Sequence, residues 1–164
     1  DDLMRQAPEI NKSVGGKNVV FQSFIAPSSG RDLRIIVANG KIVCAMMRIA
    51  STGFKANFHQ GGKVKKVNIS PELAEMAIKC TRVCKLDIAG VDVLMDKENY
   101  VICEINSSPG FEGMERASRV NVAKEFCQAA LDKINFAKMS ARLIYKFREP
   151  STVKNVPIQI DHLI

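Results

Sequence analysis

The sequence predicts an α+β domain with a mainly antiparallel sheet and helices packed on one face. Apolar segments of strand length occur in pairs joined by short turns, and amphipathic segments of helical length lie between and after them. The chain has 164 residues, of which 46% are hydrophobic and 25% are charged. This composition is typical of a globular protein that is large enough to bury a core.

Two hairpins define the predicted sheet. The segment "RDLRIIVANGKIVCAMMRIA" (31–50) has β-rich arms on either side of Asn39-Gly40, which is a strong hairpin signal. Residues 88–106 form the second hairpin. The apolar run at 18–26 is interpreted as a buried strand, and the alternating segment 63–69 as a further strand.

The helix after residue 69 has the clearest start signal. Ser70 is suited to the N-cap and Pro71 to the first helical position. We expect this helix to run to about Lys85, with Leu73 and Ala77 on its inward face. Cys80 or Cys84 is expected to continue that face.

Further helices are predicted at both ends of the chain. Residues 1–16 read as the later part of a helix that ends at Gly15-Gly16, which favours a truncated chain. After a loop at 107–115, a helix beginning near Ser118 directs Val122, Phe126 and Ala129 or Ala130 inward, and residues 138–148 are also helical in pattern. We expect one domain over 1–136, followed by a C-terminal helix and tail over 137–164.

The net charge of +7 favours an anionic partner, such as a nucleotide, an acidic substrate, nucleic acid or a membrane surface. The basic residues are scattered, so charge alone does not choose between these classes. No apolar run is long enough to span a bilayer and no signal-peptide pattern opens the chain. The five cysteines form no CxxC pair, which favours a reduced, cytoplasmic setting.

Two carboxylates stand inside the second hairpin, where an unpaired charge is costly. If a three-residue turn at 97–99 joins the arms, Asp92 lies directly across from Glu104, and Asn106 points to the same face. The opposite face, which the helices are expected to cover, then carries Val91, Val93, Met95, Val101, Cys103 and Ile105.

This arrangement has two interpretations. Asp, Glu and Asn oxygens form the kind of cluster that holds Mg²⁺ together with water and nucleotide phosphates. Alternatively, each acid pairs with a lysine or arginine of the sheet, or lies at a solvated edge. The spacing alone leaves both open.

Three longer segments resemble one family, the ATP-grasp ligases of the RimK type. They are "FQSFIAPSSGRDLRIIV", "MMRIASTGFKANFHQGG" and "AGVDVLMDKENYVICEINSSPGFEGMERASRVNVA". The family includes ribosomal-protein glutamate ligases and N-acetylaspartylglutamate synthases. The resemblance covers about residues 10–135 and implies the C-terminal part of the ATP-grasp module, with the earlier domains expected before Asp1.

The resemblance implies a metal and nucleotide site. Asp92, Glu104 and Asn106 match the family's ligands for Mg²⁺ or Mn²⁺, with Glu104 bridging two ions that contact the phosphates of ATP. Ser23 and Phe24 match the adenine-binding segment. The family's acids near the ribose are replaced by Ser23 and Pro27, which leaves Asp32 as the candidate for ribose.

The resemblance also implies the catalytic groups. Arg48 matches an arginine aimed at the γ-phosphate and the acyl-phosphate, a role that suits a planar and permanently charged fork. Lys55, Ala56 and Asn57 match a loop over the phosphates, with Asn57 counted among the catalytic residues. Lys55 stands where an arginine is usual in the family.

The implied reaction joins a carboxylate to an amine. ATP phosphorylates the carboxylate, and an amine, expected to be that of glutamate, attacks the acyl-phosphate to give an amide. Of the anionic partners that the net charge allows, we expect a nucleotide and a carboxylate substrate and no membrane. A protein substrate and a homo-oligomer are compatible with the sequence, and the fragment alone is expected to be inactive.

Two alternatives remain open. The first is a related ligase with glutathione-synthetase-like or lysine-biosynthesis-like chemistry. The second is a catalytically incomplete binding module, which would use the basic face of Lys138, Arg142 and Lys146 for an acidic or ribosomal partner.

Overall fold

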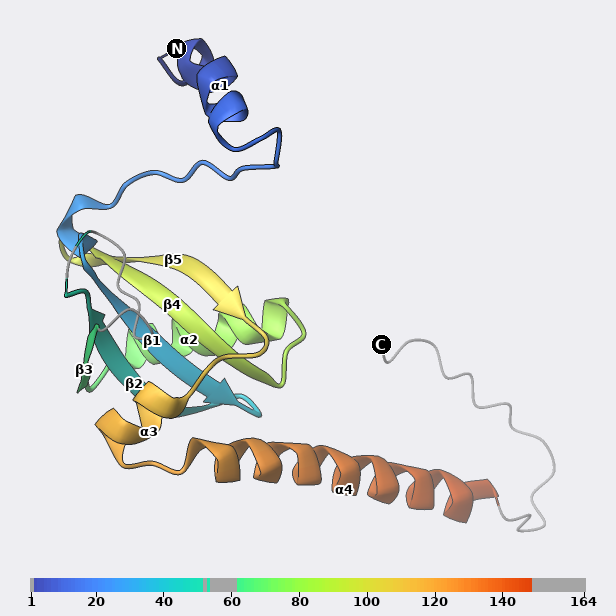
Figure 1. The fold of residues 1–164 in the computed structure, drawn as a ribbon. Helices are drawn as coiled ribbons and strands as arrows, with labels where there is room; N and C mark the ends of the chain where they lie inside the picture. The colour runs from blue at the N-terminus through green and yellow to red at the C-terminus, as the bar shows by residue number, and fades with distance from the viewer. Residues whose placement is uncertain (1, 52, 54–61, 149–164) are drawn as a thin grey trace.

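Two antiparallel hairpins and one short strand form a single sheet. The computed structural model describes residues 2–51, 53 and 62–148. The first hairpin is β1 (Arg31–Ala38) with β2 (Lys41–Ile49), and the second is β4 (Ile88–Asp96) with β5 (Asn99–Asn106). The strand β3 (Lys63–Lys66) pairs with β2, which gives the order β3-β2-β1-β4-β5 with all neighbours antiparallel (Figure 1). The predicted α+β class and antiparallel sheet are confirmed.

The turn of the first hairpin follows from its two residues. Asn39 and Gly40 have φ values of 48° and 70°, in the left-handed region that these residue types tolerate best. Such turns match the twist of the strands they join. The local sequence therefore fixes where β1 ends and β2 begins.

The helix α2 (Pro71–Val83) covers one face of the sheet. The Ser70 hydroxyl caps it by accepting a hydrogen bond from the Leu73 amide at 3.2 Å. Leu73 and Ala77 pack against the strands in a core completed by Leu33, Ile35, Val37, Ala45, Val91 and Val93. The inward face continues to Thr81, so the prediction of Cys80 or Cys84 is wrong. Four-residue spacing from Ala77 leads to Thr81, whose hydroxyl donates to the Ile78 carbonyl at 2.8 Å.

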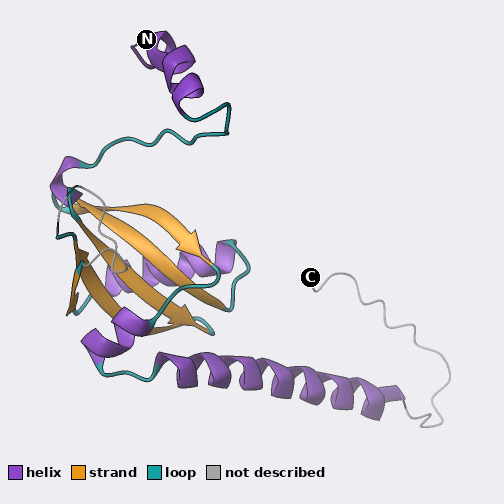
Figure 2. Cartoon of the chain, in the orientation of Figure 1, coloured by secondary structure: helices purple, strands orange, loops and turns teal. Residues whose placement is uncertain are grey.

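A second core lies on the opposite face, under α3 (Glu112–Ser118) and the start of α4 (Val122–Arg148). Its buried members are Ile36, Cys44, Met46, Met114 and Val122. Helices therefore lie on both sides of the sheet, whereas the sequence predicted one covered face (Figure 2). The reason is that the second half of the central strand β1 carries apolar residues on both sides: Ile35 and Ile36 are both fully buried and point in opposite directions.

The two C-terminal helices differ from the predicted ones in their boundaries. Residues 112–118 are helical where a loop was expected, and Arg119, with φ of 62°, ends α3. The Asn121 side chain then accepts from the Lys124 amide at 2.8 Å at the start of α4. α4 includes residues 138–148 without a break, so the expected division at 136/137 falls inside one helix. None of the described helices is long and apolar enough to cross a bilayer.

The second hairpin contains a β-bulge that the sequence analysis missed. Its turn has two residues, Lys97 and Glu98, instead of three, so Asp96 pairs with Asn99. Cys103 is an extra, unpaired residue in β5, and the register shifts by one between Val93 and Asp92. This shift restores the predicted pairing of Asp92 with Glu104. As a result Ile102 packs on the α2 core, while Val101 and Cys103 are exposed, contrary to prediction.

The N-terminal segment stands apart from the sheet (Figure 1). The helix α1 (Asp2–Ser13) ends before Gly15 and Gly16, as predicted. Residues 17–25 form no strand, and large apolar side chains in them, including Val20 and Phe24, are exposed. The predicted buried strand at 18–26 is therefore wrong. The apolar composition of this segment led to the prediction of burial, but no described strand pairs with it.

A short helix, η1 (Ala26–Ser28), ties this segment to the sheet. Ser28 is buried, and its hydroxyl accepts a hydrogen bond from the Met95 amide at 2.6 Å and contacts the Met95 carbonyl at 3.2 Å. A single side chain thus satisfies both backbone groups of a residue beyond the end of the β1–β4 pairing.

Candidate nucleotide and metal site

Four charged side chains form a row on the face of the sheet that α3 also covers. The register pairs Asp32 of β1 with Arg48 of β2, and Arg34 of β1 with Asp92 of β4. Alternation along β1 puts Asp32, Arg34 and the core residue Ile36 on one face. The charged row therefore lies next to the core of Ile36 and Met114, on the same face of the sheet.

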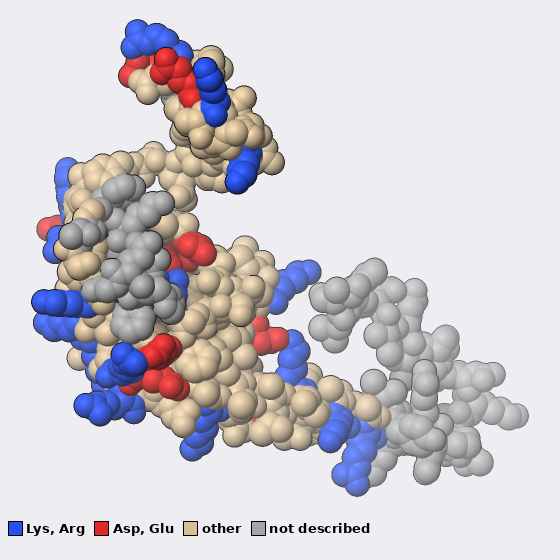
Figure 3. Space-filling model, in the orientation of Figure 1, with Lys and Arg blue, Asp and Glu red and all other residues tan. Residues whose placement is uncertain are grey.

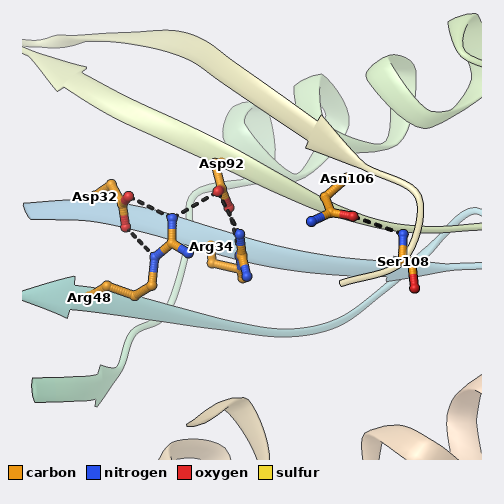
Figure 4. A network of polar contacts seen from close by, with 6 residues as sticks. All are labelled: Asp32, Arg34, Arg48, Asp92, Asn106 and Ser108. Atoms are coloured by element: carbon orange, nitrogen blue, oxygen red, sulfur yellow. Dashed lines mark hydrogen bonds and ion pairs between the residues drawn. The ribbon is translucent and has the colours of Figure 1, made fainter. Parts of the chain in front are cut away.

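These side chains form an alternating chain of charges (Figure 4). Arg48 donates from Nε and Nη2 to the two oxygens of Asp32, at 2.7 and 2.6 Å. Arg34 binds Asp92 in the same forked way, with both bonds at 2.7 Å. A bond of 2.8 Å from Nη2 of Arg48 to Oδ2 of Asp92 joins the two pairs. Asp92 is thus shared by two arginines from neighbouring strands.

The charged side chains of this network are largely buried, so each depends on its partners to offset the loss of hydration. Asp92 is 4% exposed and Arg48 9%. Burial raises the pKa of Asp32 above its ordinary 3.8, and the Arg48 hydrogen bond only partly offsets this. Burial acts to lower the pKa of Arg48, but the hydrogen bond to Asp32 and the charge of Asp92 outweigh it, so the pKa of Arg48 is raised. Removing any one member leaves a poorly hydrated charge behind.

Glu104 and Asn106 extend the row onto β5. Glu104 is the cross-strand partner of Asp92 and is exposed, and Asn106 is the partner of Gly90. The Asn106 side chain turns toward Ser108 and accepts its amide at 2.8 Å (Figure 4). The predicted common face of Asp92, Glu104 and Asn106 is confirmed by the pairing of β4 with β5. The alternative interpretation also holds in part, since Asp92 pairs with arginines of the sheet.

The donor set fits a hard divalent cation in kind. It offers two carboxylates and an amide oxygen on one face of one hairpin, which are ligands that Mg²⁺ and Mn²⁺ accept. Among the described residues, no three His, Cys, Asp or Glu side chains are gathered around one point for a metal. A carboxylate has about four acceptor positions, and three of those of Asp92 are used by arginine N–H groups. Asp92 is therefore available to a cation only in part.

Arg34 is the member of this site that sequence reasoning missed. Two-residue alternation from Asp32 places it on the site face, and that signal was available. Its partner Asp92 was not, because the pairing of β1 with β4 joins residues 58 positions apart. The two strands of a hairpin are joined by a short turn, so their pairing can be proposed from the sequence, whereas the neighbour of a hairpin in the sheet cannot.

The remaining predicted residues lie elsewhere or outside the described residues. Ser23 and Phe24 are on the extended segment before η1, and both are exposed. Lys55, Ala56 and Asn57 fall outside the described residues. Arg48 and Asp32 are in the site, bound to each other.

The loop after β5 packs directly on the floor of the site. Gly90, the partner of Asn106, lies under Pro109, and a side-chain carbon at position 90 would stand 2.8 Å from the Pro109 Cβ. Only glycine allows the "SSPG" segment to approach this closely. The loop that follows Asn106 is thus fixed against the strand that carries Asp92.

Comparison with known proteins decides the family. The RimK-like ATP-grasp domain model matches residues 3–130. The chain belongs to the RimK-like ATP-grasp family. The resemblance seen in the sequence is therefore confirmed.

The curated relatives of this RimK-like domain are longer than the chain. A "Probable alpha-L-glutamate ligase" of Aeromonas salmonicida is 42% identical over 107 residues, which are 65% of the chain and 36% of the relative. A protein of the same name from Parasynechococcus marenigrum is 39% identical over 122 residues, 74% of the chain and 26% of the relative. The chain thus spans about a quarter to a third of these relatives.

Solved structures support the ATP-grasp fold. The ATP-grasp ligase PsnB, in complex with a phosphomimetic precursor variant, Mg and ADP, is 23% identical with a TM-score of 0.53. The match covers 64% of this chain and 32% of PsnB. A RiPP-associated ATP-grasp ligase of Chryseobacterium gregarium, bound to ADP and a leader and core peptide, matches at 18% identity with a TM-score of 0.53, over 65% of this chain and 34% of the ligase.

Proposed function

We propose that the chain is part of an ATP-dependent carboxylate–amine ligase that adds glutamate. The observation that carries the proposal is the cross-strand pair of Asp92 and Glu104 beside two arginines, within a RimK-like ATP-grasp domain. This site combines oxygen ligands for a cation with two forks for phosphate. The names of the curated relatives support glutamate as one of the two substrates that are joined, and we propose that it is the amine acceptor.

The site residues then have distinct roles. Asp92, Glu104 and Asn106 would hold Mg²⁺ or Mn²⁺, as two ions, which offset the charge of the phosphates of bound ATP. Arg48 donates to the phosphoryl group in transfer and to the acyl-phosphate. We propose that Lys55, Ala56 and Asn57 close over the phosphates, and that Ser23 and Phe24 contact adenine.

Asp32 is better suited to a role other than the ribose contact expected from the resemblance. Both of its oxygens accept hydrogen bonds from Arg48. This fork fixes the plane of the Arg48 guanidinium, and Nη1 makes none of the hydrogen bonds between Arg48 and described residues. We propose that Asp32 positions Arg48 for phosphate.

The proposed reaction balances in two steps. A carboxylate oxygen of the donor attacks the γ-phosphorus of ATP, which forms the acyl-phosphate and releases ADP. The amine of glutamate then attacks the acyl carbon, inorganic phosphate leaves, and the nitrogen gives up a proton as the amide forms. The chain contributes positioning and charge neutralisation, and no side chain forms a covalent intermediate.

We further propose a cytoplasmic location and a protein or small carboxylate as donor. All five cysteines are free, which fits a reducing compartment. A homo-oligomer is compatible with this function.

A chimera tests the function. We propose that residues 3–130 replace the corresponding segment of the Aeromonas salmonicida relative, since the 164 residues alone are expected not to turn over ATP. Ligation of glutamate is then measured by mass spectrometry, with ADP release followed in parallel. The chimera is expected to be active, and Asp92→Asn to lower its rate by about 10²-fold or more. Asp87→Asn, an exposed acid outside the site, is the matched control.

Full ligation activity in the Asp92→Asn chimera would contradict the proposed site. Loss of ligation in the chimera with Asp87→Asn alone would show instead that the readout reports the stability of the domain.

The binding-module alternative has less support. Lys138 and Arg142 are exposed on α4, while the Lys146 side chain is outside the described part of the chain. The surface in Figure 3 carries basic and acidic side chains side by side rather than one basic face. A partner held by charge would need a continuous basic surface.

A further inference from the structure

Asp92 cannot coordinate a metal with both oxygens while it accepts hydrogen bonds from two arginines. Arg34 occupies one position on each of its oxygens, and Arg48 takes a second position on Oδ2. A divalent cation on this buried carboxylate would lie within a few ångströms of two guanidinium charges. Such like charges are weakly screened where water is scarce.

We propose that the two arginines compete with the divalent metal for Asp92, so that the chain binds metal weakly until an anion draws Arg34 away. This inference rests on the proposed metal role of Asp92. In this proposal Arg34 is a counterion that occupies Asp92 and weakens metal binding. It does not orient Asp92 as a metal ligand.

The two arginines differ in what they lose when Asp92 is taken by a metal. Arg48 keeps both oxygens of Asp32. Both hydrogen bonds that the structure gives Arg34 to described side chains go to Asp92. Arg34 is 13% exposed at its side chain, so it needs a new anionic partner in place. A phosphate oxygen has the charge and the geometry that a guanidinium fork accepts.

Charge balance leads to the same conclusion. The acids Asp32 and Asp92 and the cations Arg34 and Arg48 balance one another, and Glu104 beside them adds only one negative charge, which is less than a divalent cation brings. A divalent cation adds positive charge, and a phosphate chain removes it. Metal and phosphate are therefore expected to bind with positive cooperativity, which is reciprocal by thermodynamic linkage.

The first test measures metal binding without any anionic ligand. Mn²⁺ alone is titrated into the full chain, and free Mn²⁺ is counted by electron paramagnetic resonance. Arg34→Gln is expected to bind Mn²⁺ about tenfold more tightly than the unaltered chain, within the usual range of such couplings. Arg31→Gln is the matched control, because this exposed arginine of the same strand binds the Pro27 carbonyl and not Asp92. It is expected to change the affinity little.

Arg34→Lys is the second variant, in case Arg34→Gln folds poorly by circular dichroism. One ammonium group cannot span both oxygens of Asp92, so a smaller gain in Mn²⁺ affinity is expected. If the role of Arg34 were purely structural, neither substitution would raise the affinity for Mn²⁺.

The second test uses inorganic pyrophosphate in place of the metal. Pyrophosphate without metal is expected to bind Asp92→Asn more tightly than the unaltered chain, because Arg34 loses its carboxylate partner and Arg48 keeps only Asp32. Glu104→Gln removes the same charge one strand away, and no arginine bond to Glu104 is seen among the described residues. It is expected to give a smaller gain.

The outcomes separate the two levels of the proposal. If Arg34→Gln binds Mn²⁺ no more tightly while Asp92→Asn weakens Mn²⁺ binding, competition is wrong and the metal site stands. If Asp92→Asn and Glu104→Gln leave Mn²⁺ binding unchanged even with ADP present, the metal site of the proposed function is wrong, and the competition falls with it.

Discussion

The carboxylate of Asp92 accepts hydrogen bonds from two strands at once. Arg34 reaches it from β1 and Arg48 from β2, while Glu104 stands opposite on β5. The sequence predicted the pairing of Asp92 with Glu104, and the pairing is correct because two departures cancel: the turn is one residue shorter than predicted, and the bulge at Cys103 shifts the register back by one. It did not predict the arginine partners, which depend on the side-by-side placement of the two hairpins.

A first prediction concerns the acid that holds Arg48. Burial raises the pKa of Asp32 above its ordinary value, and Arg48 opposes this more strongly than any other neighbouring group. Arg48→Gln is expected to raise the pKa of Asp32 further, which a carbon-detected NMR titration of its carboxyl group measures. An unchanged or lower pKa in the variant would contradict the forked pair.

The same variant is expected to lose stability in a pH-dependent way. A folded-state pKa above the unfolded value stabilises the fold at low pH, and that contribution is lost as the pH rises through the folded pKa. In Arg48→Gln this loss grows, so the deficit in unfolding free energy is larger at pH 7 than at pH 4. About 3 kcal/mol is expected at pH 7 by urea denaturation, since a buried pair is broken. Arg31→Gln is expected to stay within about 0.5 kcal/mol.

Single local contacts decide how the elements join. Local signals predicted the Asn39–Gly40 turn and the Ser70 cap, because each acts within a few residues. The bulge at Cys103 and the exposed run at 17–25 were missed. A bulge is set by the fit of a whole strand against its neighbours, and burial of an apolar run requires a partner that its own residues do not reveal.

Ser28 provides a test of how the N-terminal segment is attached. Ser28→Ala leaves the Met95 amide without its partner, so a loss of about 1–2 kcal/mol in unfolding free energy is expected. Amide hydrogen exchange at Met95 is expected to become faster. Ser29→Ala, at an exposed position next to it, is the matched control. Equal effects of the two variants would show that the Ser28 bonds do not anchor the segment.

Gly90 tests the close approach of the loop after β5. In Gly90→Ala the new Cβ meets the Pro109 ring, and a loss of about 1–3 kcal/mol is expected with NMR shifts at Ser108 and Asn106. Pro109→Gly removes the opposing atom, so the double variant is expected to lose less than the sum of the two single changes. Strict additivity would mean that the two residues do not touch.

Across the whole molecule, the sheet separates structural and functional duties. One face, under α2, is apolar along its length, and the other passes from the second core to the charged row. The fold class and the family could be predicted from the sequence, since they depend on patterns spread over most of the chain. The covering of both faces of the sheet by helices could not be predicted, nor could the sharing of Asp92 by two arginines. Both arise only when distant segments are assembled.

The most direct measurement is a crystal structure of the chain with Mn²⁺ and ADP, with the metal located by anomalous scattering. We predict a peak about 2.1 Å from oxygens of Asp92 and Glu104, and Arg34 bound to phosphate instead of Asp92. A peak elsewhere, with Asp92 still held by both Arg34 and Arg48, would contradict the proposed site.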